Sequence, residues 1–157
     1  MKKKFTTGMI AIGVLLASLS SVAANAAWQV EKGGGATPRC FIKSGPQKMQ
    51  DGYRTISVHA ELDNESLTLV TPSNIDTSFS DLRIQVDHKT PVTSTAVVGK
   101  ESVRFIVSPQ TVNDMRRGKV LKAYLRFWPT WPVTKAHSVS FSLNGFSAAS
   151  KAAKSCN

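Results

Sequence analysis

The feature that most constrains this chain is its pair of cysteines, Cys40 and Cys156, which are the only two in 157 residues. They form no C-x-x-C motif and have no neighbouring histidines, so in an exported chain we predict a disulfide rather than a metal or redox site. Such a bridge would close a loop of more than a hundred residues. The chain-entropy model gives a stabilisation of up to about 4–5 kcal/mol for a loop of that length. Two free thiols or an intermolecular bridge are the alternatives.

Export is indicated by the first 26 residues, which have the pattern of a secretory signal peptide. Lys2, Lys3 and Lys4 precede an apolar run over 9–19, and Ala24-Asn25-Ala26 forms a small-residue cleavage site. The apolar run is shorter than the roughly 20 residues of a permanent membrane helix. We therefore predict that 1–26 is a cleaved signal peptide and that 27–157 forms a single domain, periplasmic or secreted. An uncleaved N-terminal anchor is the alternative.

The charge of the chain indicates its class of partner. The formal net charge is +10, and it falls to +7 when the three lysines of the signal peptide are removed. A basic exported domain attracts anionic partners, which outside the cytoplasm are lipopolysaccharide, lipid head groups, acidic glycans or acidic proteins. Nucleic acid is not an expected partner. The alternative is that the cations are scattered over a solvated surface and only maintain solubility.

Alternation of apolar and polar residues dominates the mature chain and predicts half-buried strands. One face of the 53–62 segment, for example, carries Ile56, Val58, Ala60 and Leu62. We predict strands at 28–31, 39–43, 53–62, 66–71, 82–87, 93–98, 103–107, 120–127 and 138–143. Many short strands with little helix between them predict a mainly β fold, an antiparallel β-sandwich or a small barrel.

One short internal helix is predicted between two of these strands. Ser108 stands in an N-cap position, Pro109 at the first helical position, and Gly118 where a helix would stop. The helix would cover 109–117. Arg116 and Arg117 fall in its last turn, where positive charge suits the helix dipole, so capping is favoured over a ligand clamp.

The end of the chain predicts a C-terminal helix. Gly145 permits a sharp turn after the last strand, and Phe146 can fill the core as the chain reverses. The small side chains that follow would let the helix lie close to the sheet. They are Ala148, Ala149, Ala152 and Ala153.

A family resemblance rests on this tail, Phe141-Ser142-Leu143-Asn144-Gly145-Phe146-Ser147-Ala148-Ala149 with the closing Cys156. Trp28, a strand led by Cys40, the 82–87 strand and a small helix before Gly118 complete the pattern. In this layout the chain resembles the invasion-associated locus B family of exported bacterial proteins. The resemblance implies a secreted or periplasmic all-β domain, associated in some members with host-cell invasion, without established enzymatic chemistry.

The best candidate for partner binding is the tryptophan-proline loop at 127–132. Trp128 and Trp131, stiffened by prolines, resemble the residues enriched in binding hot spots. Lys122, Tyr124 and Arg126 share one face of the preceding strand, which would place cations beside an aromatic ring. The alternative is that the tryptophans cap one end of the core while the prolines protect an edge strand.

Catalysis is not expected from this sequence. His59, His88 and His137 are far apart and match no metal-binding spacing, and nucleophile-elbow and phosphate-loop motifs are absent. Asp87 and His88 are adjacent, and neighbours on a strand point to opposite faces. We predict a non-catalytic binding or interaction protein of the bacterial envelope, virulence-associated as the resemblance implies, with no metal site and no cofactor. The alternatives are a periplasmic inhibitor or immunity protein and, last, a hydrolase.

Overall fold

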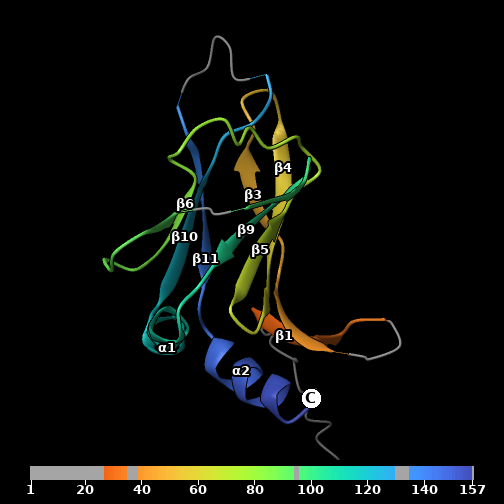
Figure 1. Cartoon of the computed structure of the whole chain (residues 1–157), viewed down its shortest axis with the longest axis vertical. Coiled ribbons are helices and arrows are strands. Elements are labelled where there is room, and N and C mark those ends of the chain that lie inside the picture. Colours follow the sequence, from red (N-terminus) through yellow and green to blue (C-terminus); the bar gives the residue numbers. More distant parts are fainter. Residues whose placement is uncertain (1–26, 35–38, 94–95, 130–134, 157) are drawn as a thin grey trace, which may run out of the picture.

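The strands form two antiparallel sheets that pack face to face (Figure 1). The computed structural model describes residues 27–34, 39–93, 96–129 and 135–156, so the predicted signal peptide lies outside the described residues. The larger sheet has the order β1-β2-β4-β5-β9-β8, and β3 also pairs with β4. Its strands are β1 (Trp28–Lys32), β2 (Cys40–Ser44), β3 (Gln47–Gln50), β4 (Thr55–Asp63), β5 (Ser66–Val70), β8 (Ala96–Gly99) and β9 (Ser102–Ile106).

The smaller sheet has the order β11-β10-β6-β7. Its strands are β6 (Arg83–Val86), β7 (Val92–Thr93), β10 (Val120–Leu125) and β11 (His137–Ser142). The predicted mainly β class is therefore confirmed, and of its two forms the structure adopts the sandwich of separate sheets rather than a closed barrel.

The core forms where the inward faces of the two sheets meet. On β4 the predicted apolar face of Ile56, Val58, Ala60 and Leu62 is buried, while the residues between them are half-buried. Every second residue of β10 is likewise buried, and both sets belong to one continuous apolar cluster. The alternation in the sequence thus reports the inward and outward faces of each sheet.

One predicted strand is wrong, and one strand of the structure was not predicted. The predicted single strand at 93–98 is wrong, because β7 pairs with β6 in the smaller sheet and β8 pairs with β9 in the larger one. A strand alternates in the same way in either sheet, so the sequence pattern does not reveal where the chain passes from the smaller sheet to the larger one. Strand β3 was not predicted, because Met49 is its one apolar residue and a single apolar residue shows no alternation. Met49 takes the inward-facing position of this strand.

The internal helix α1 (Pro109–Arg117) has the predicted bounds. The Ser108 hydroxyl accepts a 3.1 Å hydrogen bond from the backbone N–H of Thr111, which satisfies a donor of the first turn. Val112 and Met115 are buried against the core. Local signals therefore placed this helix correctly.

The C-terminal helix α2 (Phe146–Lys154) is also confirmed. Gly145 has a φ of 82°, in the left-handed region that glycine adopts readily, and Phe146 is fully buried. Ala149 and Ala153 face the core as expected. The other two alanines of the predicted set, Ala148 and Ala152, are exposed, because a single helix face meets the sheet.

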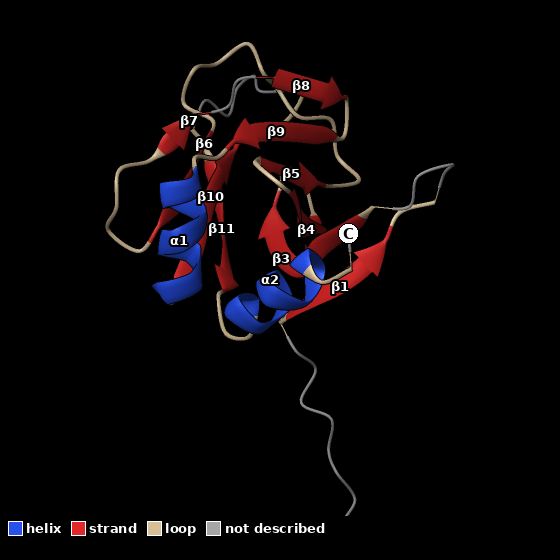
Figure 2. Cartoon of the chain, turned by 60° about the horizontal axis from the view of Figure 1, so that its bottom comes forward, coloured by secondary structure: helices blue, strands red, loops and turns tan. Residues whose placement is uncertain are grey.

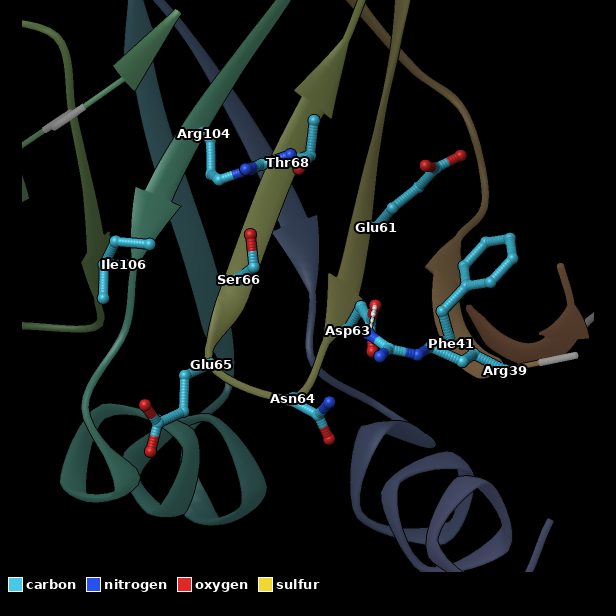
Figure 3. A pocket seen from close by; sticks show the side chains of 10 residues that line it. All are labelled: Arg39, Phe41, Glu61, Asp63, Asn64, Glu65, Ser66, Thr68, Arg104 and Ile106. Carbon is cyan, nitrogen blue, oxygen red and sulfur yellow. Dashed lines mark ion pairs between the residues drawn. The ribbon is translucent and has the colours of Figure 1, made fainter. Parts of the chain in front are cut away.

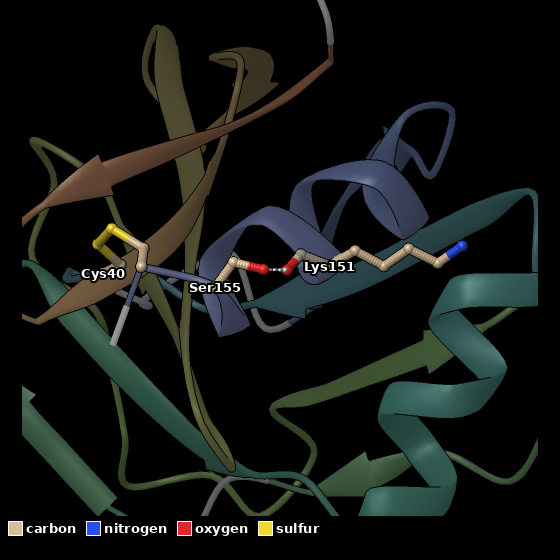
Figure 4. Close-up of a disulfide and its surroundings, with 4 residues drawn as sticks. Cys40, Lys151 and Ser155 are labelled. Carbon is tan, nitrogen blue, oxygen red and sulfur yellow. Dashed lines mark hydrogen bonds between the residues drawn. A yellow bond between two sulfur atoms is a disulfide. The ribbon is translucent and has the colours of Figure 1, made fainter.

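A disulfide joins Cys40, the first residue of β2, to Cys156, just beyond α2 (Figure 4). The two Cα atoms are 5.9 Å apart across 116 positions of sequence. In Figure 4 the Ser155 hydroxyl also donates a 3.4 Å hydrogen bond to the Lys151 carbonyl at the end of the helix. The predicted pairing is thus present, and it ties α2 to the larger sheet.

Both helices lie at one end of the sandwich, at the bottom of Figure 1. Helix α2 contacts β1, β2 and α1, and the two helices lie side by side in Figure 2. We refer to this as the helix end. Strand β10 starts three residues after α1 and runs away from it (Figure 1), so the residues that follow β10, including Trp128, lie toward the opposite end. Neither of the described helices is long and apolar enough to cross a membrane.

Candidate functional site

The predicted face of β10 carries a cation–aromatic cluster. Lys122 and Tyr124 are half-buried on the outer face of the smaller sheet. The Lys122 Nζ lies 5.2 Å from the centre of the Tyr124 ring. Arg83 of β6, which pairs with Tyr124 across the strands, places its guanidinium carbon 3.9 Å from the same ring centre. Arg83 was not predicted as a site residue, because the sequence does not show which strand lies beside β10.

Arg126, the second of the two predicted cations, follows the last residue of β10 and forms its contacts within the protein. Its Nε and Nη2 donate hydrogen bonds of 2.7 and 2.6 Å to the two carboxylate oxygens of Asp81. The side chain is 11% exposed and its guanidinium stacks over the ring of Phe79 at 4.2 Å. The hydrogen bond from Arg126 lowers the pKa of Asp81, although burial opposes this, and the same bond raises the pKa of Arg126. Because its charge is neutralised, Arg126 has little to offer an anionic partner.

Trp128 is exposed in the described part of the predicted loop, with 57% of its surface accessible. Its backbone is held firmly, because its N–H donates a 2.9 Å hydrogen bond to the Asn74 carbonyl and the preceding Phe127 forms a β-bridge with Ile75. The Tyr53 hydroxyl donates a 3.4 Å hydrogen bond to the carbonyl of Pro129. Trp131 lies outside the described residues. Trp128 is thus presented to solvent rather than packed as a cap on the core.

A hollow of about 550 Å³ opens beside Trp128. We call it the Trp128 hollow. Its wall includes Val98, which is 46% exposed, and the cation Lys100, both from the end of β8 and its turn. Asn74 and Thr77 supply polar side chains from the segment after β5. No carboxylate is among the described residues that line it. Lys122, Tyr124 and Arg126 do not line it either, so the structure separates the predicted strand face from the predicted loop.

A second large hollow, of about 560 Å³, lies on the outer face of the larger sheet (Figure 3). It spans β2, β4, β5 and β9 and holds charges of both signs. Figure 3 shows Arg39 directed at Asp63, with which it forms a 4.0 Å ion pair. On the same sheet face, Lys43 lies 3.5 Å from Glu61. Because these charges pair with one another, this face does not favour a partner of either sign.

The three histidines lie in separate environments. His59 pairs with Glu61 at 3.0 Å, His88 is exposed, and His137 packs near Phe127 with ring centres 6.2 Å apart. Within the described part of the chain, no three His, Cys, Asp or Glu side chains are placed to hold a metal ion. The Asp87 carboxylate accepts hydrogen bonds from the backbone N–H groups of Lys119 and Val120, at 3.1 and 3.0 Å, so it holds the start of β10 rather than orienting His88.

Comparison with known proteins identifies a solved structure with a similar fold. No family model matches this sequence, and no curated protein is significantly similar to it. Among solved structures, the crystal structure of invasion associated protein B from Bartonella henselae matches with a TM-score of 0.59 and 22% sequence identity. The match covers 83% of this chain and 92% of that one. The chain therefore has the fold of an invasion associated protein, in agreement with the resemblance seen in its sequence.

Proposed function

We propose that this chain is an exported, non-catalytic binding protein of the bacterial envelope, and that its partner contacts the Trp128 hollow. One observation carries the proposal: an exposed tryptophan on a firmly held backbone stands beside a hollow whose described lining residues include a lysine and no carboxylate. A rigid aromatic anchor loses little conformational entropy on binding, which is why tryptophan is frequent in binding hot spots.

The chemistry of the hollow favours an anionic saccharide. The Trp128 ring offers a flat surface for the apolar face of a sugar ring, and Asn74 and Thr77 can hydrogen-bond to its hydroxyls. Lys100 can pair with an acidic substituent. Of the partner classes expected from the basic charge, acidic glycans and the sugar portion of lipopolysaccharide meet all three requirements.

Export and a link to virulence form part of the same proposal. The signal-peptide pattern supports export, and the disulfide is compatible with an oxidising compartment. The likeness to an invasion associated protein supports a role at the host interface. The net charge of +7 on the mature chain would attract an anionic surface at long range.

The test is binding to immobilised lipopolysaccharide and to a neutral polysaccharide, measured by surface plasmon resonance. Trp128→Ala and Lys100→Gln should each weaken lipopolysaccharide binding by about tenfold or more, as expected for a hot-spot residue. Two matched controls, Tyr124→Ala on the β10 face and Lys89→Gln in the exposed turn after β6, should leave it nearly unchanged.

The outcomes separate the possible functions. Equal losses in Lys100→Gln and Lys89→Gln, with Trp128→Ala unchanged, would show that binding depends on overall charge and would overturn the hollow as the site. Loss in Tyr124→Ala alone would assign the site to the outer face of β10. A tight stoichiometric complex with an envelope enzyme, in place of glycan binding, would favour the inhibitor alternative.

A further inference from the structure

A small hollow opens at the helix end, where α1 and α2 meet the larger sheet. Its volume is about 80 Å³. At about 30 Å³ per water molecule, this is room for two or three waters. It is therefore large enough for one small group but not for a sugar ring or a peptide side chain with its backbone.

The floor of this hollow is apolar. It consists of Ile42 of β2, Leu62 of β4, Val112 of α1 and Ala153 of α2, all of them buried. Cys40 also lines it, so the disulfide that holds the end of α2 forms part of the wall. The site therefore depends on all the elements that meet at the helix end.

The rim is cationic. Arg116 of α1 and Lys154 of α2 line the hollow from its two sides, together with the neutral polar residues Asn64 and Ser150. No carboxylate lines it among the described residues. This differs from the outer face of the larger sheet, where Arg39 and Lys43 have acidic neighbours.

The orientation of Arg116 is fixed by the neighbouring helix. Its Nε donates a 2.9 Å hydrogen bond to the hydroxyl of Ser150, which is itself buried. Within the described chain, Arg116 has no other hydrogen bond and no ion pair. A guanidinium held through Nε keeps both Nη groups available, and these can form bidentate hydrogen bonds with an oxyanion. The position in the last turn of α1 predicted a capping role, but the contact with α2 directs this side chain across to the hollow.

We propose that the helix-end hollow binds a phosphate group. A phosphate monoester carries about −1.5 to −2 charges near pH 7, which the two rim cations match. Arginine binds phosphate with two parallel hydrogen bonds, and Asn64 and Ser150 can donate hydrogen bonds to the remaining phosphate oxygens. The site lies at the opposite end of the sandwich from Trp128, so it is independent of the proposed glycan site.

The experiment uses two lining variants and two neighbours that do not line the hollow. Binding of inorganic phosphate and of short-chain phosphatidic acid is measured by isothermal titration calorimetry. Arg116→Gln and Lys154→Gln should each weaken binding by about tenfold, since each removes a charged hydrogen-bond partner. Arg117→Gln and Lys151→Gln, one turn or less away on the same helices, should change it by less than twofold.

The same set of variants includes a control for correct folding. Arg116→Gln also removes the bond to buried Ser150, so its thermal unfolding is compared with that of wild type. Lys154 is exposed and its variant should unfold normally, which keeps the proposal testable if Arg116→Gln is unstable.

The two ligands distinguish the source of the phosphate. Tighter binding of phosphatidic acid than of inorganic phosphate supports a lipid head group, whereas equal binding supports free phosphate. Absence of binding by both ligands overturns the proposal. Equal weakening in all four variants also overturns it, because that result indicates diffuse surface charge.

Discussion

The indole Nε1 of Trp28 donates a 2.7 Å hydrogen bond to the backbone carbonyl of Ser142, across 114 positions of sequence. This bond connects the first strand of the larger sheet to the last strand of the smaller one. The same indole packs edge-on against Phe146, with ring centres 5.0 Å apart. Trp28 therefore holds together two sheets and the C-terminal helix.

Replacing Trp28 by phenylalanine should lower the free energy of unfolding by about 1–3 kcal/mol. The ring remains apolar, but the Ser142 carbonyl loses its donor in a partly buried position. The measurement is urea denaturation followed by circular dichroism. Trp128→Phe is the matched control, and because Trp128 is exposed its unfolding free energy should change by no more than about 0.5 kcal/mol. Equal losses in the two variants would contradict the role given to Trp28.

Removing the disulfide should lower the free energy of unfolding more than replacing Trp28 does. The double variant Cys40→Ser with Cys156→Ser should lose about 2–5 kcal/mol of unfolding free energy, because the unfolded chain is no longer constrained by its long loop. Wild type measured with a thiol reductant should fall to the level of the double variant. The reductant should have no effect on the double variant, and a further loss there would point to a cause other than this bridge.

The sequence contained enough information for elements whose signals are local. Ser108 and Pro109 specify the start of α1 through a hydrogen bond that spans three residues, so its bounds were predicted correctly. Alternation likewise predicted the inward face of β4.

Relationships between distant segments could not be predicted in the same way. The stacking of Arg83 on Tyr124 depends on β6 lying beside β10, and a single sequence does not show strand order. The Trp128 hollow combines residues 74, 75, 77, 98–100 and 128. The Ile75–Phe127 bridge and the hydrogen bond from the Ile75 N–H to the Lys100 carbonyl join these segments. Trp128 was predicted as a binding residue from its type and its proline neighbours, but the other residues of the hollow carry no sequence signal of their own.

Gly118 follows α1 for a reason other than the one expected of a helix stop. Its φ is −78°, which any residue adopts, but an added Cβ would lie 2.7 Å from Val86 Cγ1 and 2.8 Å from the Asp114 carbonyl. Gly118→Ala should therefore cost about 1–3 kcal/mol of unfolding free energy through overpacking. Gly34→Ala, where nothing lies within 4 Å of the added Cβ, is the control and should be neutral or slightly stabilising. The free energies of unfolding of both variants are measured by chemical denaturation. Equal values for the two variants would contradict the steric role given to Gly118.

His137 should make the stability of the fold depend on pH. Burial lowers the pKa of its imidazole below the usual 6.5, the nearby cations Lys135 and Arg126 lower it further, and Asp51 opposes the shift. The unfolded chain therefore takes up a proton at this histidine before the folded one does, so stability present above about pH 6.5 is lost as the pH falls toward the lowered pKa. Thermal unfolding between pH 7.5 and 5 should show a smaller loss of stability in His137→Gln than in wild type. His88→Gln, at an exposed position, should retain the wild-type slope, and an unchanged slope in His137→Gln would show that another group controls this pH range.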